Sequence, residues 1–254
     1  MPDGLAIATS RTKRDLPAKM ADRLIVALDF HDIEQARNMV KSLKGIVSFF
    51  KLGLRLQYEP EFAHLLAELK EAGNNIFLDA KMYDIPETVS GAVASAVRRK
   101  VDFITVHGDE HIMKAAVAAK GDSKMKIFAI TVLTSLDDAS LRAMGYAVGA
   151  RELVQMRAKL AVQSGCDGII ASADDQPNDL RHLAQSAGLL IATPGVRRKD
   201  AAADDQKRIA TPGEAIASGA DYLVVGRPIL QALDPAREAG AFIKEMEDAE
   251  AARP

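Results

Sequence analysis

The sequence predicts a single α/β domain with the (β/α)8 TIM-barrel fold. Eight short apolar segments alternate with longer amphipathic segments along a chain of 254 residues, and barrels of this type typically contain about 250 residues. Strict alternation fits either a closed barrel or a large open sheet. A dinucleotide-binding open sheet should carry the motif GxGxxG after its first strand, whereas this chain has Asp29-Phe30-His31-Asp32 there. We therefore expect the closed barrel.

The eight apolar segments have the composition of parallel strands. Most are continuously apolar, as expected for strands that are covered by helices on one side and packed inside the barrel on the other. We expect strands over Leu24–Leu28, Val47–Leu52, Asn75–Asp79, Phe103–His107, Ile127–Leu133, Gly168–Ser172, Leu189–Thr193 and Tyr222–Val225.

The segments between these strands have helical periodicity. In Asp32–Leu43 the apolar residues Ile33, Ala36, Val40 and Leu43 fall on one face of a helix. We expect seven further helices, over Glu61–Ala72, Glu87–Arg99, Ile112–Ala119, Glu152–Gln163, Asn178–Ser186, Gly213–Ala217 and Ala236–Glu247.

No repeat and no Pro-, Gly- or Ser-rich linker divides the chain. We expect one barrel domain over residues 22–247, preceded by a flexible leader over residues 1–21 and followed by a short tail over residues 248–254.

The composition argues against several functional classes. Lys and Arg (33) nearly balance Asp and Glu (35). The chain therefore lacks the excess of positive charge that would indicate binding to a nucleic acid or a membrane surface. No apolar stretch approaches the roughly 20 residues that span a bilayer, and the leader lacks the apolar core of a secretory signal. The single cysteine, Cys166, lies in an apolar run and fits a core position better than a nucleophile. We expect a cytoplasmic protein.

Four charged residues follow the second and third predicted strands. Lys51 ends the second strand, Asp79 and Lys81 end the third, and Asp84 lies just beyond. Catalytic groups of TIM barrels gather at these strand ends. Opposite charges at close range hold each other ionised, so the series suits a reaction that needs fixed charges. A plain salt-bridge network at the barrel rim would explain the spacing equally well.

A second cluster predicts a phosphate site. Gly195 follows the seventh predicted strand, and Gly226 and Arg227 follow the eighth. The loops after these two strands often bind phosphate in TIM barrels. The long irregular stretch from Gly195 to about Ile209 is expected to be a mobile active-site loop.

These residues resemble the motifs of orotidine 5′-phosphate decarboxylases. Asp79-Ala80-Lys81-Met82-Tyr83-Asp84-Ile85-Pro86-Glu87-Thr88-Val89 is similar to the signature DxKxxDIPxTV of that family. Three more segments agree in order and spacing, namely Val26-Ala27-Leu28-Asp29, Phe50-Lys51-Leu52-Gly53, and Thr193-Pro194-Gly195-Val196-Arg197 through Gln206 to Val225-Gly226-Arg227-Pro228. The similarity covers roughly residues 23 to 247. Tyr83 departs from the histidine that many members carry.

The resemblance implies decarboxylation of orotidine 5′-monophosphate (OMP) to UMP, the last step of de novo pyrimidine nucleotide biosynthesis, without a metal or another cofactor. It implies that Lys81 protonates C6 after carbon dioxide leaves and that Asp79 faces the substrate carboxylate. The other implied substrate contacts are Asp29 and Lys51 with the ribose, Thr134 with the pyrimidine, and Gly195, Gln206, Gly226 and Arg227 with the phosphate.

The resemblance also implies a homodimer with shared active sites. Asp84, Ile85 and Thr88 would each reach into the site of the other subunit.

Two other functions compete with this interpretation. Sugar-phosphate lyases of the same superfamily, such as 3-keto-gulonate 6-phosphate decarboxylase, share the DxKxxD spacing but bind magnesium with an acid at the end of the second strand. This chain has Lys51 there, whose charge would repel the metal, and its five histidines show no metal-ligand spacing. A non-catalytic nucleotide-binding barrel would be expected to lose the charged series. His107, at the end of the fourth strand, fits a structural role better than a catalytic one.

Overall fold

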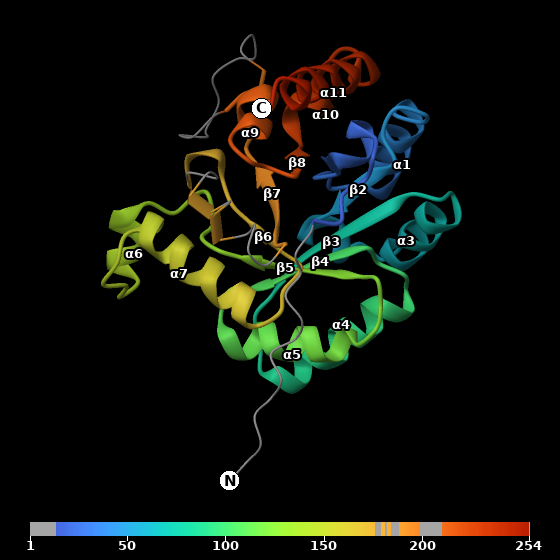
Figure 1. Ribbon diagram of the computed structural model, residues 1–254. Coiled ribbons are helices and arrows are strands. Elements are labelled where there is room, and N and C mark those ends of the chain that lie inside the picture. Colours follow the sequence, from blue (N-terminus) through green and yellow to red (C-terminus); the bar gives the residue numbers. More distant parts are fainter. Residues whose placement is uncertain (1–13, 176–178, 181, 184–187, 199–209, 254) are drawn as a thin grey trace.

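The chain folds into a closed barrel of eight parallel strands, as the computed structural model shows (Figure 1). The structure describes residues 14–175, 179–180, 182–183, 188–198 and 210–253. The strands follow one another around the barrel in chain order, and β1 pairs with β8 to close it. The prediction of a TIM barrel is confirmed. The strands are β1 (Leu24–Ala27), β2 (Phe49–Leu52), β3 (Asn75–Met82), β4 (Phe103–His107), β5 (Lys126–Ile130), β6 (Gly168–Ile170), β7 (Leu190–Pro194) and β8 (Tyr222–Val225).

Helices surround the barrel (Figure 1). The longer ones are α1 (Ile33–Ser42), α3 (Phe62–Glu71), α4 (Pro86–Arg98), α5 (Glu110–Lys120), α7 (Ala150–Gln163) and α11 (Pro235–Ala251). The shorter ones are α2 (Leu54–Gln57), α6 (Asp138–Ala143), α9 (Pro212–Ala217) and α10 (Arg227–Leu230), with single 3-10 turns over Met20–Arg23 and Ala173–Asp175. Of the predicted helices, only that over Asn178–Ser186 falls largely outside the described residues. No helix in the described ranges is both long and apolar enough to cross a membrane.

Side-chain caps explain where several helices begin. The side chain of Asp32 accepts a hydrogen bond from the second residue of α1, and Asp234 accepts one from the third residue of α11. Thr211 and Glu214 form a reciprocal capping box at the start of α9. Each cap gives a partner to a backbone N–H group that the helix leaves unpaired, which typically stabilises a helix by about 1 kcal/mol.

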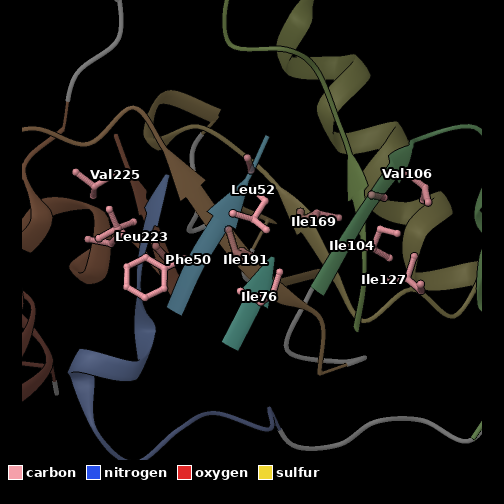
Figure 2. Packing of buried hydrophobic residues seen from close by; sticks show 14 of the residues in the cluster. Phe50, Leu52, Ile76, Ile104, Val106, Ile127, Ile169, Ile191, Leu223 and Val225 are labelled. Carbon is pink, nitrogen blue, oxygen red and sulfur yellow. The ribbon is translucent and has the colours of Figure 1, made fainter. Parts of the chain in front are cut away.

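Alternation along the strands separates two hydrophobic clusters. Residues that point outward pack against the helices, including Phe50, Leu52, Ile104, Leu223 and Val225 (Figure 2). Residues that point inward form a second, largely aromatic cluster, which contains Ile25, Ala27, Phe49, Phe77, Phe103, Phe128, Leu190, Ala192, Tyr222 and Val224. Side chains of a β-strand point alternately to its two faces, and in this barrel both faces are covered. The aromatic cluster forms the floor beneath the functional site.

Some strand ends differ from the predictions. β5 ends at Ile130 rather than at Leu133, and the chain turns away as Arg157 donates a hydrogen bond to the carbonyl of Thr131. β3 instead continues past Asp79 to Met82, through an irregularity in its pairing with β4. Strand propensity does not reveal either end, because both depend on residues distant in sequence.

Some residues of both predicted terminal segments lie in contacts or in a helix. Of the expected leader, residues 1–13 lie outside the described residues, but Arg14 forms an ion pair with Asp221 at 2.6 Å and Asp15 one with Lys126 at 2.8 Å. Leu16 packs against the aromatic cluster inside the barrel. Residues 14–16 therefore lie against the N-terminal ends of the strands. At the other terminus, α11 continues to Ala251, into the expected tail.

Candidate active site

A cavity opens at the C-terminal ends of the strands. Eight of the twelve residues predicted for the site line it: Asp29, Lys51, Asp79, Lys81, Thr134, Gly195, Gly226 and Arg227. They come from segments spread over nearly 200 residues of sequence and from the ends or following loops of β1, β2, β3, β5, β7 and β8. The barrel brings them to one end because its strands are all parallel.

Three ion pairs form a continuous row in this cavity. The Nζ atom of Lys51 lies 3.0 Å from Oδ1 of Asp29 and 3.3 Å from Oδ2 of Asp79. The same oxygen of Asp79 lies 2.6 Å from Nζ of Lys81. The side chains of Lys51 and Asp79 are each 10% exposed, and that of Lys81 is 37% exposed. The row thus runs from two buried charges to an ammonium group that reaches into the cavity.

Mutual attraction keeps the two buried groups ionised. Burial by itself raises the pKa of Asp79, but the positive charges of Lys51 and Lys81 outweigh it, and the net pKa lies below the usual value for a carboxyl group. Burial lowers the pKa of Lys51, while Asp79 and Asp29 raise it more, so that the net pKa is raised. Both shifts favour the charged forms at neutral pH.

Close packing around Lys51 requires a glycine at position 53. A Cβ atom on Gly53 would lie 3.0 Å from Oδ1 of Asp29 and 3.2 Å from Nζ of Lys51. The absence of a side chain there lets the loop between β2 and α2 pass beside the ion pair.

Lys81 has an unusual backbone conformation. Its φ angle is +46°, a region that residues other than glycine rarely adopt and that is often found at active sites. Its amide donates a hydrogen bond of 2.8 Å to the side-chain oxygen of Thr105 on β4. The hydroxyl of Thr105 in turn donates a hydrogen bond of 2.9 Å to Oδ1 of Asp79.

Thr105 was not among the predicted site residues, although the sequence contains a pattern that indicates it. Phe49, Phe77 and Phe103 all point into the barrel, and the residues two positions later are Lys51, Asp79 and Thr105. Because side chains alternate along a strand, these three residues share the inward face and occupy the next layer toward the mouth. Counting from the phenylalanines would have included Thr105 with the charged pair.

Three of the predicted phosphate residues line the cavity where β7 and β8 end. Gly195 follows β7 with a φ angle of +78°, a conformation that favours glycine. Gly226 follows β8, and Arg227 begins α10. Arg197, which was not predicted, is buried and lines the same cavity. Gln206 and most of the predicted loop over residues 195–209, namely residues 199–209, lie outside the described residues.

The predicted residues on the loop after β3 and at the start of α4 do not join the row within one chain. Asp84, Ile85 and Thr88 are exposed and are not among the residues that line the cavity. Oδ1 of Asp84 accepts a hydrogen bond of 2.6 Å from the amide of Ile85. A single chain therefore brings together three members of the predicted charged series and leaves the fourth outside.

Comparison with known proteins identifies the family. The model of the "Orotidine 5′-phosphate decarboxylase / HUMPS family" matches residues 22–242. The chain belongs to this family. The resemblance stated from the sequence is confirmed, together with the enzyme class, carboxy-lyase.

Individual members of the family support the same assignment. Orotidine 5′-phosphate decarboxylase of Nitrobacter winogradskyi is 49% identical over 90% of this chain and 94% of its own length. The enzyme of the same name from Rhodopseudomonas palustris strain BisA53 is 46% identical over 91% and 97%. Among solved structures, orotidine 5′-phosphate decarboxylase of Lactobacillus acidophilus superposes with a TM-score of 0.76 at 34% identity, covering 89% of this chain and 99% of that chain.

The family description joins two designations, so the groups around the row that could bind a metal ion are relevant. The described residues contain no group of three or more His, Cys, Asp or Glu side chains that could hold a metal ion. The two carboxylates of the row, Asp29 and Asp79, both contact the ammonium group of Lys51. The protein itself therefore supplies a positive charge between these two carboxylates, the ammonium group of Lys51.

Proposed function

We propose that this protein decarboxylates OMP to UMP in pyrimidine nucleotide biosynthesis, without a metal or organic cofactor. The observation that carries the proposal is the row Lys51–Asp79–Lys81 at the mouth of the barrel, with ion pairs of 3.3 Å and 2.6 Å. Full-length relatives at 44–49% identity that bear the name of this activity support it.

The chemistry needs a fixed positive charge beside C6 of the pyrimidine. When the bond between C6 and the carboxyl carbon breaks, the electron pair remains at C6 and carbon dioxide departs. The ammonium group of Lys81 stabilises this developing negative charge and then transfers a proton to C6, after which solvent reprotonates the amine. Fixed charges directed at a transition state typically contribute about 3–4 kcal/mol per group.

Asp79 assists the same step by facing the carboxylate of the substrate. Its lowered pKa keeps it ionised, so it repels the carboxylate of bound OMP, and that repulsion is relieved when carbon dioxide leaves. Asp79 also holds Lys81 through the 2.6 Å ion pair. Lys51 neutralises Asp79 in part and, with Asp29, is placed to bind the ribose hydroxyls.

The remaining cavity residues bind groups that do not react. Gly195, Gly226 and Arg227 are proposed to hold the phosphate together with Gln206, and Thr134 to contact the pyrimidine. Phosphate binding, although remote from C6, would raise the rate if these contacts are stronger in the transition state than in the ground state.

A second subunit completes the proposed site. Asp84 and Ile85 lie on the exposed loop between β3 and α4, and Thr88 is exposed in the first turn of α4. In a homodimer with shared sites, these three residues would enter the cavity of the partner. Their exposure in the single chain is consistent with this role.

The proposal can be tested with the purified protein and OMP. Loss of the ultraviolet absorbance of OMP should be observed, and it should persist in the presence of EDTA. Absence of turnover with tight UMP binding would instead favour a nucleotide-binding barrel. Activity abolished by EDTA and restored by magnesium would favour the metal-dependent lyases.

Replacement of Lys81 tests its role as proton donor. Lys81→Ala should lower kcat by at least about a thousandfold, since it removes both the proton donor and the charge at C6, while UMP binding stays measurable. Lys100→Ala is a matched control, because Lys100 also has a positive φ angle, of +56°, but is exposed and far from the cavity residues in sequence and fold. Near-normal turnover by Lys81→Ala would refute the assignment.

A further inference from the structure

Thr105 occupies a position inside the barrel from which it can organise the catalytic row without touching substrate. It lies in the middle of β4, is fully buried, and does not line the cavity. It is the third member of the inward-facing layer that contains Lys51 and Asp79. A hydroxyl group in this layer has no role in the chemistry proposed above.

The two hydrogen bonds of Thr105 determine which way its proton points. A hydroxyl group has one proton to donate. The oxygen of Thr105 accepts the amide proton of Lys81 at 2.8 Å, and its own proton is directed to Oδ1 of Asp79 at 2.9 Å. One side chain therefore contacts the backbone of one catalytic residue and the carboxylate of the other.

These contacts leave Asp79 little freedom to rotate. Its Oδ1 accepts from Thr105, and its Oδ2 lies against both Lys81 and Lys51. Both oxygens of the carboxylate are engaged from different strands. Rotation of the Asp79 carboxylate would break at least one contact of each of its two oxygens.

The hydrogen bond from the amide of Lys81 to Thr105 is made by the residue whose backbone is strained. A φ angle of +46° in a lysine costs free energy unless surrounding contacts compensate. Immediately after Lys81, Met82 pairs again with Val106 on β4. The hydrogen bond to Thr105 and the pairing of Met82 with Val106 hold the backbone of β3 in position at Lys81. From this backbone the lysine side chain reaches Asp79.

We propose that Thr105 is a positioning residue that fixes Asp79 and Lys81 in their reactive arrangement. This inference depends on the proposed decarboxylation for its kinetic consequence, but its structural content stands without it. The matched variants are Thr105→Val, which keeps the shape and removes the hydroxyl, and Thr105→Ser, which keeps the hydroxyl.

The kinetic test compares kcat and KM for OMP. Thr105→Val should lower kcat about 10- to 100-fold, as expected for the loss of hydrogen bonds to a charged group, with a change in KM of less than about threefold because the phosphate contacts are intact. Thr105→Ser should recover most of kcat. Equal kcat in the wild type and Thr105→Val would overturn the proposal.

A control separates positioning from a general effect on the barrel. Thr193 is a fully buried threonine on β7 whose side-chain oxygen has no hydrogen-bond partner among the described residues. Thr193→Val makes the same chemical change on another barrel strand and should leave kcat within about twofold of the wild type. If both valine variants lose kcat to the same extent, Thr105 has only a structural role.

Crystal structures distinguish failure of this inference from failure of the proposed function. A wild-type protein that does not decarboxylate OMP refutes the proposed function. In that event the structure of Thr105→Val still decides the inference: a rotated Asp79 carboxylate or a displaced Lys81 supports it, and an unchanged row overturns it.

Discussion

Lys51 and Asp79 have opposite pKa shifts with one common cause, their mutual contact at 3.3 Å. The lowered pKa of Asp79 gives a contribution to stability that is present above the unfolded value of 3.8 and is lost as the pH falls through the folded value. The raised pKa of Lys51 gives a contribution that is present below 10.5 and is lost as the pH rises through the folded value. Neither Lys51 nor Asp79 changes its charge between about pH 5 and pH 9, so the charges of this pair are constant over the physiological range.

Gly53 offers a test of how precisely this row must be held. In Gly53→Ala the new Cβ atom would contact Asp29 and Lys51 at 3.0 and 3.2 Å, so these groups must move apart by a few tenths of an ångström. We expect kcat/KM for OMP to fall by about tenfold or more, because small misplacements of reacting groups are costly. The measurement is steady-state kinetics at neutral pH.

Gly240→Ala is the control for Gly53→Ala. A Cβ atom on Gly240, within α11, would have no neighbour within 4 Å, and replacing a helical glycine by alanine should raise stability by about 0.5–1 kcal/mol. Its kcat/KM should match that of the wild type. If Gly53→Ala also has wild-type kinetics, the site tolerates displacement of the Asp29–Lys51 pair.

At the scale of elements, the end of β4 supports the loop that follows β3. The ring of His107 lies 4.5 Å from the ring of Tyr83, which directly precedes Asp84. His107 also contacts Asp109 at 3.2 Å, and Arg157 contacts the same aspartate at 3.5 Å. This arrangement connects β4 and α7 to the residues proposed to enter the partner subunit.

His107 should make stability depend on pH below neutrality. Burial, and then the charge of Arg157, lower its pKa despite the opposing effect of Asp109. A histidine whose folded pKa is lowered stabilises the fold fully above the unfolded value of 6.5, and this contribution decreases as the pH falls toward the folded value. We expect Tm to fall between pH 7 and pH 5, and to fall less in His107→Phe, which keeps a ring but cannot be protonated.

Substitutions of His107 also measure how much its ring contact with Tyr83 contributes to stability. His107→Ala removes both the titration and the contact with Tyr83, and should be less stable than His107→Phe by about 0.5–1.5 kcal/mol, the usual value of an aromatic pair. Thermal unfolding of the wild type and both variants at the two pH values separates the two effects. An equal loss of Tm on acidification in all three proteins would contradict the assignment to His107.

At the scale of the whole molecule, large apolar side chains are exposed on the loops that follow β3 and β5. Tyr83 and Ile85 are 68% and 65% exposed, and Leu133 is 43% exposed. Two of these flank Asp84, the member of the charged series that a single chain leaves outside the cavity. A dimer that buries this surface and completes the site would explain both observations.

Mixed subunits test the shared site. Chains with Asp79→Ala should be inactive, as should chains with Asp84→Ala. Random exchange of equal amounts gives about half heterodimers, each with one intact site, so the mixture should recover up to about a quarter of wild-type activity. The measurement is OMP turnover after subunit exchange, with heterodimers confirmed by differently tagged chains.

The control mixture combines Asp79→Ala with Lys81→Ala. These two residues contact each other within one chain, so no heterodimer of these variants contains an intact site, and activity should not return. Confirmed heterodimers of Asp79→Ala and Asp84→Ala that remain as inactive as this control would show that Asp84 does not act in the site of the partner.

The sequence alone was sufficient to predict the barrel, seven of its helices, and eight of the residues that line the cavity. Strand and helix periodicities are local patterns, and the rule that strand ends meet at one rim places Lys51, Asp79 and Lys81 together without any coordinates. The family motifs supplied the remaining residues of the site.

Only the tertiary structure showed where the strands end and how the charged row is supported. The irregular end of β3 and the turn after Ile130 depend on contacts with Thr105 and Arg157, which lie more than 20 residues away in sequence. The contacts of Arg14 and Asp15 with the barrel are likewise nonlocal. Such hydrogen bonds and ion pairs form between side chains that the closure of the barrel brings together, and no periodicity along the chain records them.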